Sequence, residues 1–578
     1  MAPTRHEKQQ LPQDRRKGES ALSDFAEYVQ KQQSRRGKPL AADSTAAAVA
    51  EEHDELDIID QLGLDDESAT AVRLKHILLD QGASADESVA LLSNHLNARL
   101  LEGHGEALFD LGLEDNGDPM GFSKDDWDFA LARLEQAAAD VNADFRVLMT
   151  RNVGGDVDVG PANAKDTSVS GKLIVRHRPE SVDDVIETRI AVVGNVDAGK
   201  STMLGVLVKG GLDDGRGKMR VNLFRHKHEI ESGRTSSVGM EIMGFDSKGE
   251  VVSSTVPGRK LSWEEIGRRS AKVISFTDLA GHEKYLRTTV FGMLSSEPNY
   301  CLLMVAANNG LVGMSKEHLG IAVALNVPIM VIITKIDICP PNILQETITQ
   351  LTKILKSPGA RKIPIFIKDR ETCINTATQF VSRRICPIFQ VSNVTGECVD
   401  LVRTFLNILP HHGNYDPEAP FEFHVNDTFS VPFVGTVVSG VVKSGVLHSG
   451  DTVLVGPDSL GQFITTKVYR EFIAEVLILS HATTIKTKYQ AMLHVGPVSQ
   501  TCAIIDIDRS YIRTGDRATV AFRFVQRPEY LTVGERILFR EGRTKGLGIV
   551  KAVGYDPKKP LNPEAAAERE KENGGTTK

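Results

Sequence analysis

The sequence runs Gly194-Asn195-Val196-Asp197-Ala198-Gly199-Lys200-Ser201-Thr202 directly after an apolar segment, residues 190–193, that predicts a β-strand. Residues 203–208 continue with helical spacing, so this glycine-rich turn joins a strand to a helix. Glycines let backbone N–H groups turn inward around an anion, and the helix N-terminus adds partial positive charge at the same point. The pattern therefore predicts a phosphate-binding loop with a nucleoside triphosphate as its ligand.

Further polar motifs lie at the ends of predicted strands, where doubly wound sheets bind their ligands. Strands are predicted at residues 189–193, 272–278, 300–306, 328–334 and 386–392. Three of them end in Asp278-Leu279-Ala280-Gly281-His282, in Thr334-Lys335-Ile336-Asp337 and in Ser392-Asn393-Val394. Because strands alternate with helices over residues 186–412, we expect an α/β fold with a doubly wound, mostly parallel sheet.

The residues around the loop suit the chemistry of a triphosphate with Mg²⁺. Lys200 can reach the β- and γ-phosphates, and the Ser201 hydroxyl can ligate Mg²⁺. Asp278 can hold the same ion through a water molecule, while the Gly281 N–H can meet the γ-phosphate. Thr235 lies in a polar segment suited to a mobile loop and can complete the Mg²⁺ shell when the γ-phosphate is present.

The remaining motifs predict which base is bound. The carboxylate of Asp337 can accept from both N1–H and the 2-amino group of guanine, a donor pair that adenine lacks. Backbone N–H groups of Ser392-Asn393-Val394 can cap the guanine O6. Each motif occurs by chance on its own, but all of them in this order predict GTP/GDP with Mg²⁺ as the bound ligand.

Composition narrows the cellular setting and the partners. Six scattered cysteines without CxxC spacing, a polar N-terminus and the absence of a long apolar run predict a cytoplasmic protein with reduced thiols and no membrane contact. The overall charge of −8 divides into +3 for residues 1–50, −18 for residues 51–150 and +7 for the remainder. A mildly basic catalytic part suits an RNA partner, and an ordinary solvated surface explains it equally well.

Local patterns divide the chain into segments. Residues 145–149 and 173–176 predict strands that feed the main sheet, and Ser123 marks the start of a helix over residues 125–141. Short strands broken by glycine after residue 420, one of them at residues 451–455, predict small β-barrels. We expect a disordered N-terminus (1–50), an acidic helical extension (51–144), a P-loop GTPase domain (145–412, its core from about 186), a second domain (419–468), a third (469–556) and a loose tail (557–578).

Several segments resemble a known family. The loop and the histidine after Gly281 are similar to those of the translational GTPases, elongation factors Tu and 1-alpha. Residues 224–237, Phe-Arg-His-Lys-His-Glu-Ile-Glu-Ser-Gly-Arg-Thr-Ser-Ser, and residues 278–286 closely match the GTP-binding protein 1 and 2 family, also called GP-1. The resemblance covers about residues 145–555 and implies a GTPase domain followed by two β-barrels.

The resemblance also implies roles and partners. His282 would position the water that attacks the γ-phosphate, Asp197 would shape the loop, and Ser201 with Thr235 would hold Mg²⁺. Aminoacyl-tRNA and the ribosome are the implied partners of a monomeric switch. The alternative is a GTP-gated adaptor in RNA turnover or signalling, whose acidic extension recruits a protein partner.

Two departures from the family stand out. Arg234 replaces the apolar residue that gates the histidine in elongation factors, although Val196 supplies the other side of the gate. The second barrel holds about half of the expected residues, with the gap near residues 461–470. We interpret the gap as a missing exon or mispredicted intron; the other interpretation is that this chain has lost the pocket for the aminoacylated tRNA end.

Overall fold

The computed structural model describes residues 74–563 except 81, 83–84, 114–119, 153–156, 159–168, 182–183, 222, 224–228, 230–234, 236–237, 254–260, 381–383, 412–417, 433–434, 449, 457–467, 480–483, 497 and 542. The predictions for residues 1–50, for Arg234 and for most of the tail therefore lie outside the described residues.

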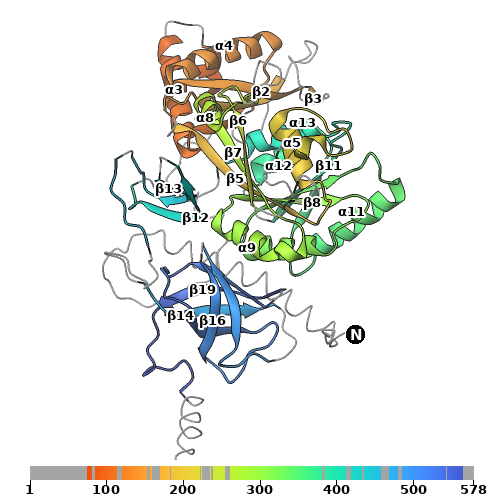
Figure 1. Ribbon diagram of the computed structural model, residues 1–578. Coiled ribbons are helices and arrows are strands. Elements are labelled where there is room, and N and C mark those ends of the chain that lie inside the picture. The colour runs from red at the N-terminus through yellow and green to blue at the C-terminus, as the bar shows by residue number, and fades with distance from the viewer. Residues whose placement is uncertain are drawn as a thin grey trace, which may run out of the picture.

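A seven-stranded sheet forms the centre of the molecule (Figure 1). Its order is β10-β11-β9-β8-β5-β7-β6, and every pair is parallel except β6–β7. The strands are β5 (Ile186–Gly194), β6 (Gly239–Phe245), β7 (Lys272–Asp278), β8 (Tyr300–Ala306), β9 (Ile329–Thr334), β10 (Ile363–Ile367) and β11 (Ile385–Val391). The central strands β8 and β9 are buried along their whole length, as expected for a parallel sheet covered on both faces. The predicted mostly parallel α/β fold is confirmed.

Helices cover both faces of this sheet. Alternation along β5 directs Ala191 and Val193 into one apolar core and Ile190 and Val192 into another. The first core includes residues of α9, α10 and α11, and the second includes residues of α5, α12 and α13. The helices are α5 (Lys200–Lys209), α6 (Lys218–Val221), α8 (Trp263–Arg269), α9 (Leu286–Ser295), α10 (Met314–Ala324), α11 (Pro341–Leu355), α12 (Arg370–Gln379) and α13 (Val399–Ile408), with the 3₁₀ turn η3 (Glu283–Tyr285) before α9.

The described part of the N-terminal extension, from residue 74, contains helices and also a sheet that the sequence analysis did not predict; residues 51–73 of the predicted helical extension lie outside the described residues. Ser123 caps α4 through a capping box, so the predicted helix start is confirmed. The sheet has the order β1-β4-β2-β3, and its described pairs are antiparallel. Its elements are α3 (Ala85–Glu102), β1 (Glu106–Leu111), α4 (Lys124–Asp140), β2 (Ala143–Asn152), β3 (Val157–Asp158) and β4 (Val169–His177). We call α3 through β4 the N-terminal unit.

The prediction that residues 145–149 and 173–176 feed the main sheet is wrong. These residues lie in β2 and β4, which pair with each other and with β1 and β3. The physical reason is that β5, the next strand in the chain, is already flanked by β7 and β8 and offers no free edge. The N-terminal sheet instead packs one of its faces against the central domain. Leu148 and Ile174 belong to the same apolar core as residues of α12 and α13.

A two-stranded sheet and a closed barrel follow the central domain. The strands β12 (Glu422–Val431) and β13 (Gly435–Ser444) pair only with each other among the described residues. The barrel has the order β14-β17-β16-β15-β18-β19, and Leu538 and Leu547 of its wall join the core beside α9 and α10. Its strands are β14 (Glu471–Ile478), β15 (Gln490–Val495), β16 (Val498–Ile507), β17 (Arg517–Phe524), β18 (Arg536–Glu541) and β19 (Arg543–Val553).

The predicted strand at residues 451–455 is wrong, because these residues have no regular structure. Leu454 and Val455 are exposed, so no neighbouring strand covers this segment. Within the described part of the chain, no helix has the length and apolar character needed to cross a bilayer. All six cysteines are free thiols.

Candidate functional site

The glycine-rich loop leaves β5 at the carboxyl edge of the sheet and enters α5. Gly194 lies so close to β8 that a Cβ would sit 2.4 Å from the Met304 carbonyl oxygen. Asp197 and Gly199 adopt left-handed backbone conformations with φ of 59° and 84°. These turns give the loop a concave backbone surface. Helix α5 begins at Lys200, immediately after Gly199. The helix N-terminus and the loop N–H groups thus converge where a phosphate would bind.

Lys200 is buried beneath this loop. Its Nζ donates to the carbonyl oxygens of Gly194 at 3.2 Å and of Asn195 at 2.9 Å. Burial lowers the pKa of the Lys200 ammonium, while the negative charges of Asp278 and Asp197 act in the opposite direction. A cation kept in this position by carbonyl groups is ready to exchange them for phosphate oxygens.

Three oxygen-bearing side chains from separate segments meet beside Lys200. Ser201 Oγ lies 2.5 Å from Asp278 Oδ2 and 2.9 Å from Thr235 Oγ1. The other carboxylate oxygen, Asp278 Oδ1, is buried without a hydrogen-bond partner among the described residues. Burial raises the pKa of Asp278, and Lys200 partly offsets this effect. Hydroxyl and carboxylate oxygens are the ligands that Mg²⁺ prefers, and an unsatisfied buried oxygen fits a site completed by a hydrated cation.

His282 follows the turn that ends β7. The turn lies tight against the loop, since a Cβ on Gly281 would sit 2.5 Å from Lys200 Nζ and 2.6 Å from the Gly194 oxygen. The ring of His282 is half-buried, and its Nδ1 accepts from the Lys284 N–H at 3.1 Å. That bond leaves Nε2 of the same ring as the nitrogen able to meet a water molecule.

Most of the residues described so far line a common cavity. It is formed by Val196, Asp197, Gly199, Lys200, Ser201, Thr202, Arg220, Thr235, Gly281 and His282. A much larger cavity of about 2060 Å³ lies between the N-terminal unit, the central domain, β13 and the barrel, and it is lined by none of these residues. Size alone therefore does not identify the reactive site; the converging polar groups do.

The motifs predicted to hold the base lie at the same edge of the sheet. Thr334 ends β9 and pairs with Val391, the last residue of β11, so the turn that starts at Ser392 lies beside the end of β9. Thr334 Oγ1 donates to the Ala198 carbonyl at 2.9 Å and ties this strand to the phosphate loop. Asp337 is exposed three residues further on, and Lys335 is half-buried with a φ of 63°.

The turn after β11 is held by its own side chain. Ser392 Oγ accepts from the N–H groups of Val394 at 3.2 Å and Thr395 at 3.0 Å. The Asn393 carbonyl accepts from the Asp213 N–H at 2.8 Å, while Asn393 Oδ1 is buried and unpartnered among the described residues. A polar atom left unsatisfied at this point fits a ligand that donates a hydrogen bond.

Sequence reasoning missed the groups that hold the loop from behind. Ser315 Oγ of α10 accepts from the Asn195 N–H at 2.9 Å, and His318 Nδ1 accepts from the Gly194 N–H at 3.2 Å. Burial lowers the pKa of His318 to about 3, so its ring is neutral and able to accept. Arg220 of α6 also lines the cavity. None of the three stands in a recognisable motif, so only the fold could reveal them.

A phosphate loop, a strand-end aspartate beside its serine and a base motif on the neighbouring strand define the class of P-loop GTPases. Residues 187–411 match the family described as "Elongation factor Tu GTP binding domain". GTP-binding protein 1 of Xenopus laevis is 45% identical over 527 residues, which cover 83% of this chain and 78% of that protein. GTP-binding protein 2 of Mus musculus is 41% identical over 512 residues, which cover 79% of this chain and 83% of that protein.

Among solved structures, bacterial selenocysteine-specific elongation factor EF-Sec aligns with a TM-score of 0.47 at 16% identity, over 67% of this chain and 61% of that chain. The assignment to a family therefore depends on the sequence comparisons alone. The chain belongs to the GTP-binding protein 1 and 2 family of translational GTPases. It is therefore a GTP hydrolase whose central domain resembles that of elongation factor Tu.

Proposed function

We propose that this GTPase is a conformational switch acting on aminoacyl-tRNA and the ribosome, in translation elongation or its quality control. The observation that carries the proposal is the meeting of Thr235 and Asp278 at Ser201. Thr235 precedes β6 and Asp278 ends β7, so two segments of the chain converge on one hydroxyl of the phosphate loop. The presence of a γ-phosphate would decide whether they stay together, as in other GTPase switches. The match to the elongation factor Tu domain supports the link to translation.

Each group has a proposed role in hydrolysis. Lys200 and the loop N–H groups neutralise charge on the β- and γ-phosphates, and the Gly281 N–H contacts the γ-phosphate. Ser201 and Thr235 would hold Mg²⁺, with Asp278 contributing through water, and the ion would supply positive charge beside the phosphates. His282 orients the attacking water. Asp337 recognises guanine.

Replacing the histidine tests the proposed chemistry. We expect His282→Ala to keep GTP binding but to slow ribosome-stimulated turnover by about 10³-fold or more, as for other groups that organise the attack on a phosphoryl group. The exposed His76, which precedes α3, provides the matched control, because His76→Ala removes the same ring away from the site. Equal turnover by wild type and His282→Ala would refute the role.

Capture of aminoacyl-tRNA tests the proposed partner. The full chain loaded with a non-hydrolysable GTP analogue should retain aminoacyl-tRNA, and the same chain loaded with GDP should release it. Retention that does not depend on the nucleotide, or no retention at all, would contradict the translation role. We place the reaction in the cytoplasm and treat the active species as a monomer.

The second candidate is an adaptor in RNA turnover or signalling. The net charge of −18 on residues 51–150 favours this function, because the rest of the chain carries a net positive charge. A strongly acidic extension suits a basic protein partner. Nucleotide-dependent capture of a protein but not of tRNA by the full chain would favour this function over the first.

We further propose that β12 and β13 are half of a barrel whose second half is missing from this chain. Apolar side chains of β13 and of the segment that follows it are exposed, including Val437, Val438 and Leu454. Half of a barrel also leaves an unprotected sheet edge, which favours aggregation. Sequencing of the transcript across residues 461–470 tests the proposal: abundant mRNA that encodes this junction would show that the short form is genuine.

A further inference from the structure

The antiparallel pair β6–β7 connects the residues around Ser201 to a buried interface at the opposite end of the two strands. At the end near Ser201, Gly239 of β6 pairs with Asp278 of β7, and Gly239 comes shortly after Thr235 in the chain. At the other end, Phe245 pairs with Lys272. The seven residues of β7 span about 20 Å at the usual strand rise. Whatever holds the Lys272 end therefore influences where Asp278 and Thr235 lie.

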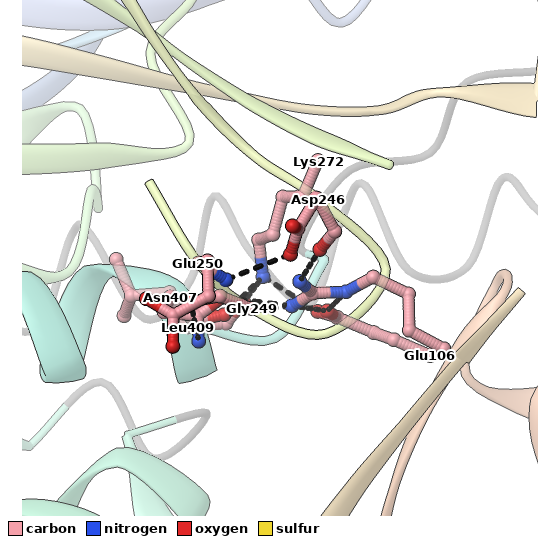
Figure 2. Close-up of polar contacts among 8 residues, drawn as sticks. Glu106, Asp246, Gly249, Glu250, Lys272, Asn407 and Leu409 are labelled. Atoms are coloured by element: carbon pink, nitrogen blue, oxygen red, sulfur yellow. Dashed lines mark hydrogen bonds and ion pairs between the residues drawn. The ribbon is translucent and has the colours of Figure 1, made fainter. Parts of the chain in front are cut away.

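The side chain of Lys272 reaches into a buried cluster of charged groups (Figure 2). Its Nζ donates to Glu106 Oε1 at 2.6 Å, to the Asn407 carbonyl at 3.1 Å and to the Leu409 carbonyl. Glu106 comes from β1 of the N-terminal unit, 166 residues away in sequence. The side chains of Lys272 and Glu106 are 0% and 8% exposed. The ion pair thus joins the N-terminal unit to the central sheet out of contact with water.

Arg176 of β4 completes the cluster. Its Nη2 donates to Glu106 Oε2 at 2.7 Å and to the Asn407 carbonyl at 3.0 Å, and its Nη1 donates to the Asp246 carbonyl at 3.1 Å. Asp246 directly follows β6, so one guanidinium contacts the N-terminal unit, α13 and the β6–β7 pair. The side chain of Arg176 is 1% exposed.

The charges in the cluster depend on one another. Burial acts to raise the pKa of Glu106, but Lys272 and Arg176 outweigh it, so that pKa lies below its usual range. Burial lowers the pKa of Lys272 to about 8 against the opposing effect of Glu106, which leaves Lys272 charged at neutral pH. Two cations share one carboxylate, and oxygens of Asn407, Asp246 and Leu409 accept further N–H groups. Removing Glu106 would leave two buried cations without a counter-charge, and removing Lys272 would break the link between Glu106 and β7.

A second set of contacts holds the turn that follows β6. Arg146 of β2 donates to the Gly249 carbonyl at 3.4 Å and pairs with Glu250 at 2.8 Å. The side chain of Asn407 also donates to the Gly249 carbonyl, at 3.3 Å. Arg146 is only half-buried, so it can be changed without burying a lone charge.

We propose that Lys272, Arg176 and Glu106 are positioning residues through which the N-terminal unit clamps the β6–β7 pair and favours the GTP-bound arrangement of the site. The pair cannot slide along its neighbours without breaking the buried cluster. In the arrangement that the cluster holds, Thr235 and Asp278 both reach Ser201. That arrangement serves a γ-phosphate with Mg²⁺ and offers little to GDP, so the clamp raises affinity for GTP relative to GDP. The inference concerns nucleotide preference and does not depend on an RNA partner.

The test compares nucleotide affinities in the full chain. Fluorescent GDP and a non-hydrolysable GTP analogue are titrated with Mg²⁺ into wild type, Lys272→Met and Arg146→Ala. We expect Lys272→Met to lower affinity for the analogue relative to GDP about tenfold, within the usual range of coupling between sites, and Arg146→Ala to lower it by a smaller factor. Lys272→Arg should largely restore the ratio.

The matched control is Lys172→Ala, because Lys172 lies on the same strand as Arg176 but pairs, among the described residues, with Asp110 of the N-terminal unit. A merely structural role would weaken both nucleotides together. Folded Lys272→Met and Arg146→Ala proteins that keep the wild-type affinity ratio would overturn the proposal. Should Lys272→Met fail to fold, the ratio in Arg146→Ala decides alone.

Discussion

The contact of Gly281 with the phosphate loop gives a sharp prediction for hydrolysis. A Cβ added there would sit 2.5 Å from Lys200 Nζ, 2.6 Å from the Gly194 oxygen and 2.7 Å from the Asn195 carbonyl carbon. The lysine end can shift, but the other two atoms are backbone. Gly194 is itself packed against Met304, so the turn that carries Gly281 has to move. Ordinary contacts of this kind lie near 3.5 Å, which implies a displacement of roughly 1 Å.

A misplacement of that size costs about 100-fold in rate when it affects reacting groups. We therefore expect Gly281→Ala to lower the single-turnover rate of GTP hydrolysis about 100-fold. Affinity for GDP should change little, because the loop and the base motif stay in place. The measurement is release of labelled phosphate from GTP, together with a titration of fluorescent GDP.

Gly320→Ala is the matched control. Gly320 lies in α10, and apart from its own helical turn no described atom lies within 4 Å of the added Cβ, so this variant should hydrolyse GTP at the wild-type rate. A folded Gly281→Ala protein with an undiminished rate would show that the turn and the loop are not packed as described.

Three other predictions follow from the same structure. Asp337→Asn should shift preference from guanosine to xanthosine nucleotides in competition binding, because the amide can donate to the extra carbonyl of xanthine; an unchanged preference would place the base elsewhere. Glu106 has a lowered pKa, so its ionised form stabilises the fold above about pH 4.5, and this contribution is lost as the pH falls through the lower folded value. As the pH falls below about 4.5, thermal unfolding of wild type should therefore depend more steeply on pH than that of Glu106→Gln. Parallel curves would contradict an ionised Glu106 in the cluster. Phe405→Ala should cost about 3–5 kcal/mol in urea unfolding, because the buried ring packs against Phe380 and Phe389; a loss below about 1 kcal/mol would mean that the core repacks.

The phosphate loop and its strand were predictable because the signal is local. A glycine-rich turn between an apolar strand and a helix needs no distant contact to be recognised. The same holds for the turn at Asp278 and for the polar ends of β9 and β11. Parallel strands bring their carboxyl ends to one edge, so the convergence of these motifs could also be inferred from the sequence.

What escaped prediction depends on contacts between distant residues. His318 and Ser315 sit on a helix in a pattern typical of ordinary packing, and only the fold places them behind the phosphate loop. The ion pair of Glu106 with Lys272 joins residues far apart in the chain, and hydrophobic periodicity carries no information about such a pair. The N-terminal sheet was missed for the same reason, since β1 pairs with β4, which lies beyond α4, β2 and β3 in the chain.

The central claim is that the phosphate loop, Thr235 and Asp278 gather around the terminal phosphate of GTP together with Mg²⁺. Calorimetric titration of the full chain with a GTP analogue and with GDP, each with and without Mg²⁺, tests it most directly. We expect removal of Mg²⁺ to weaken the analogue far more than GDP. Equal dependence on Mg²⁺ for both nucleotides, or no heat with a protein shown to be folded, would contradict the account.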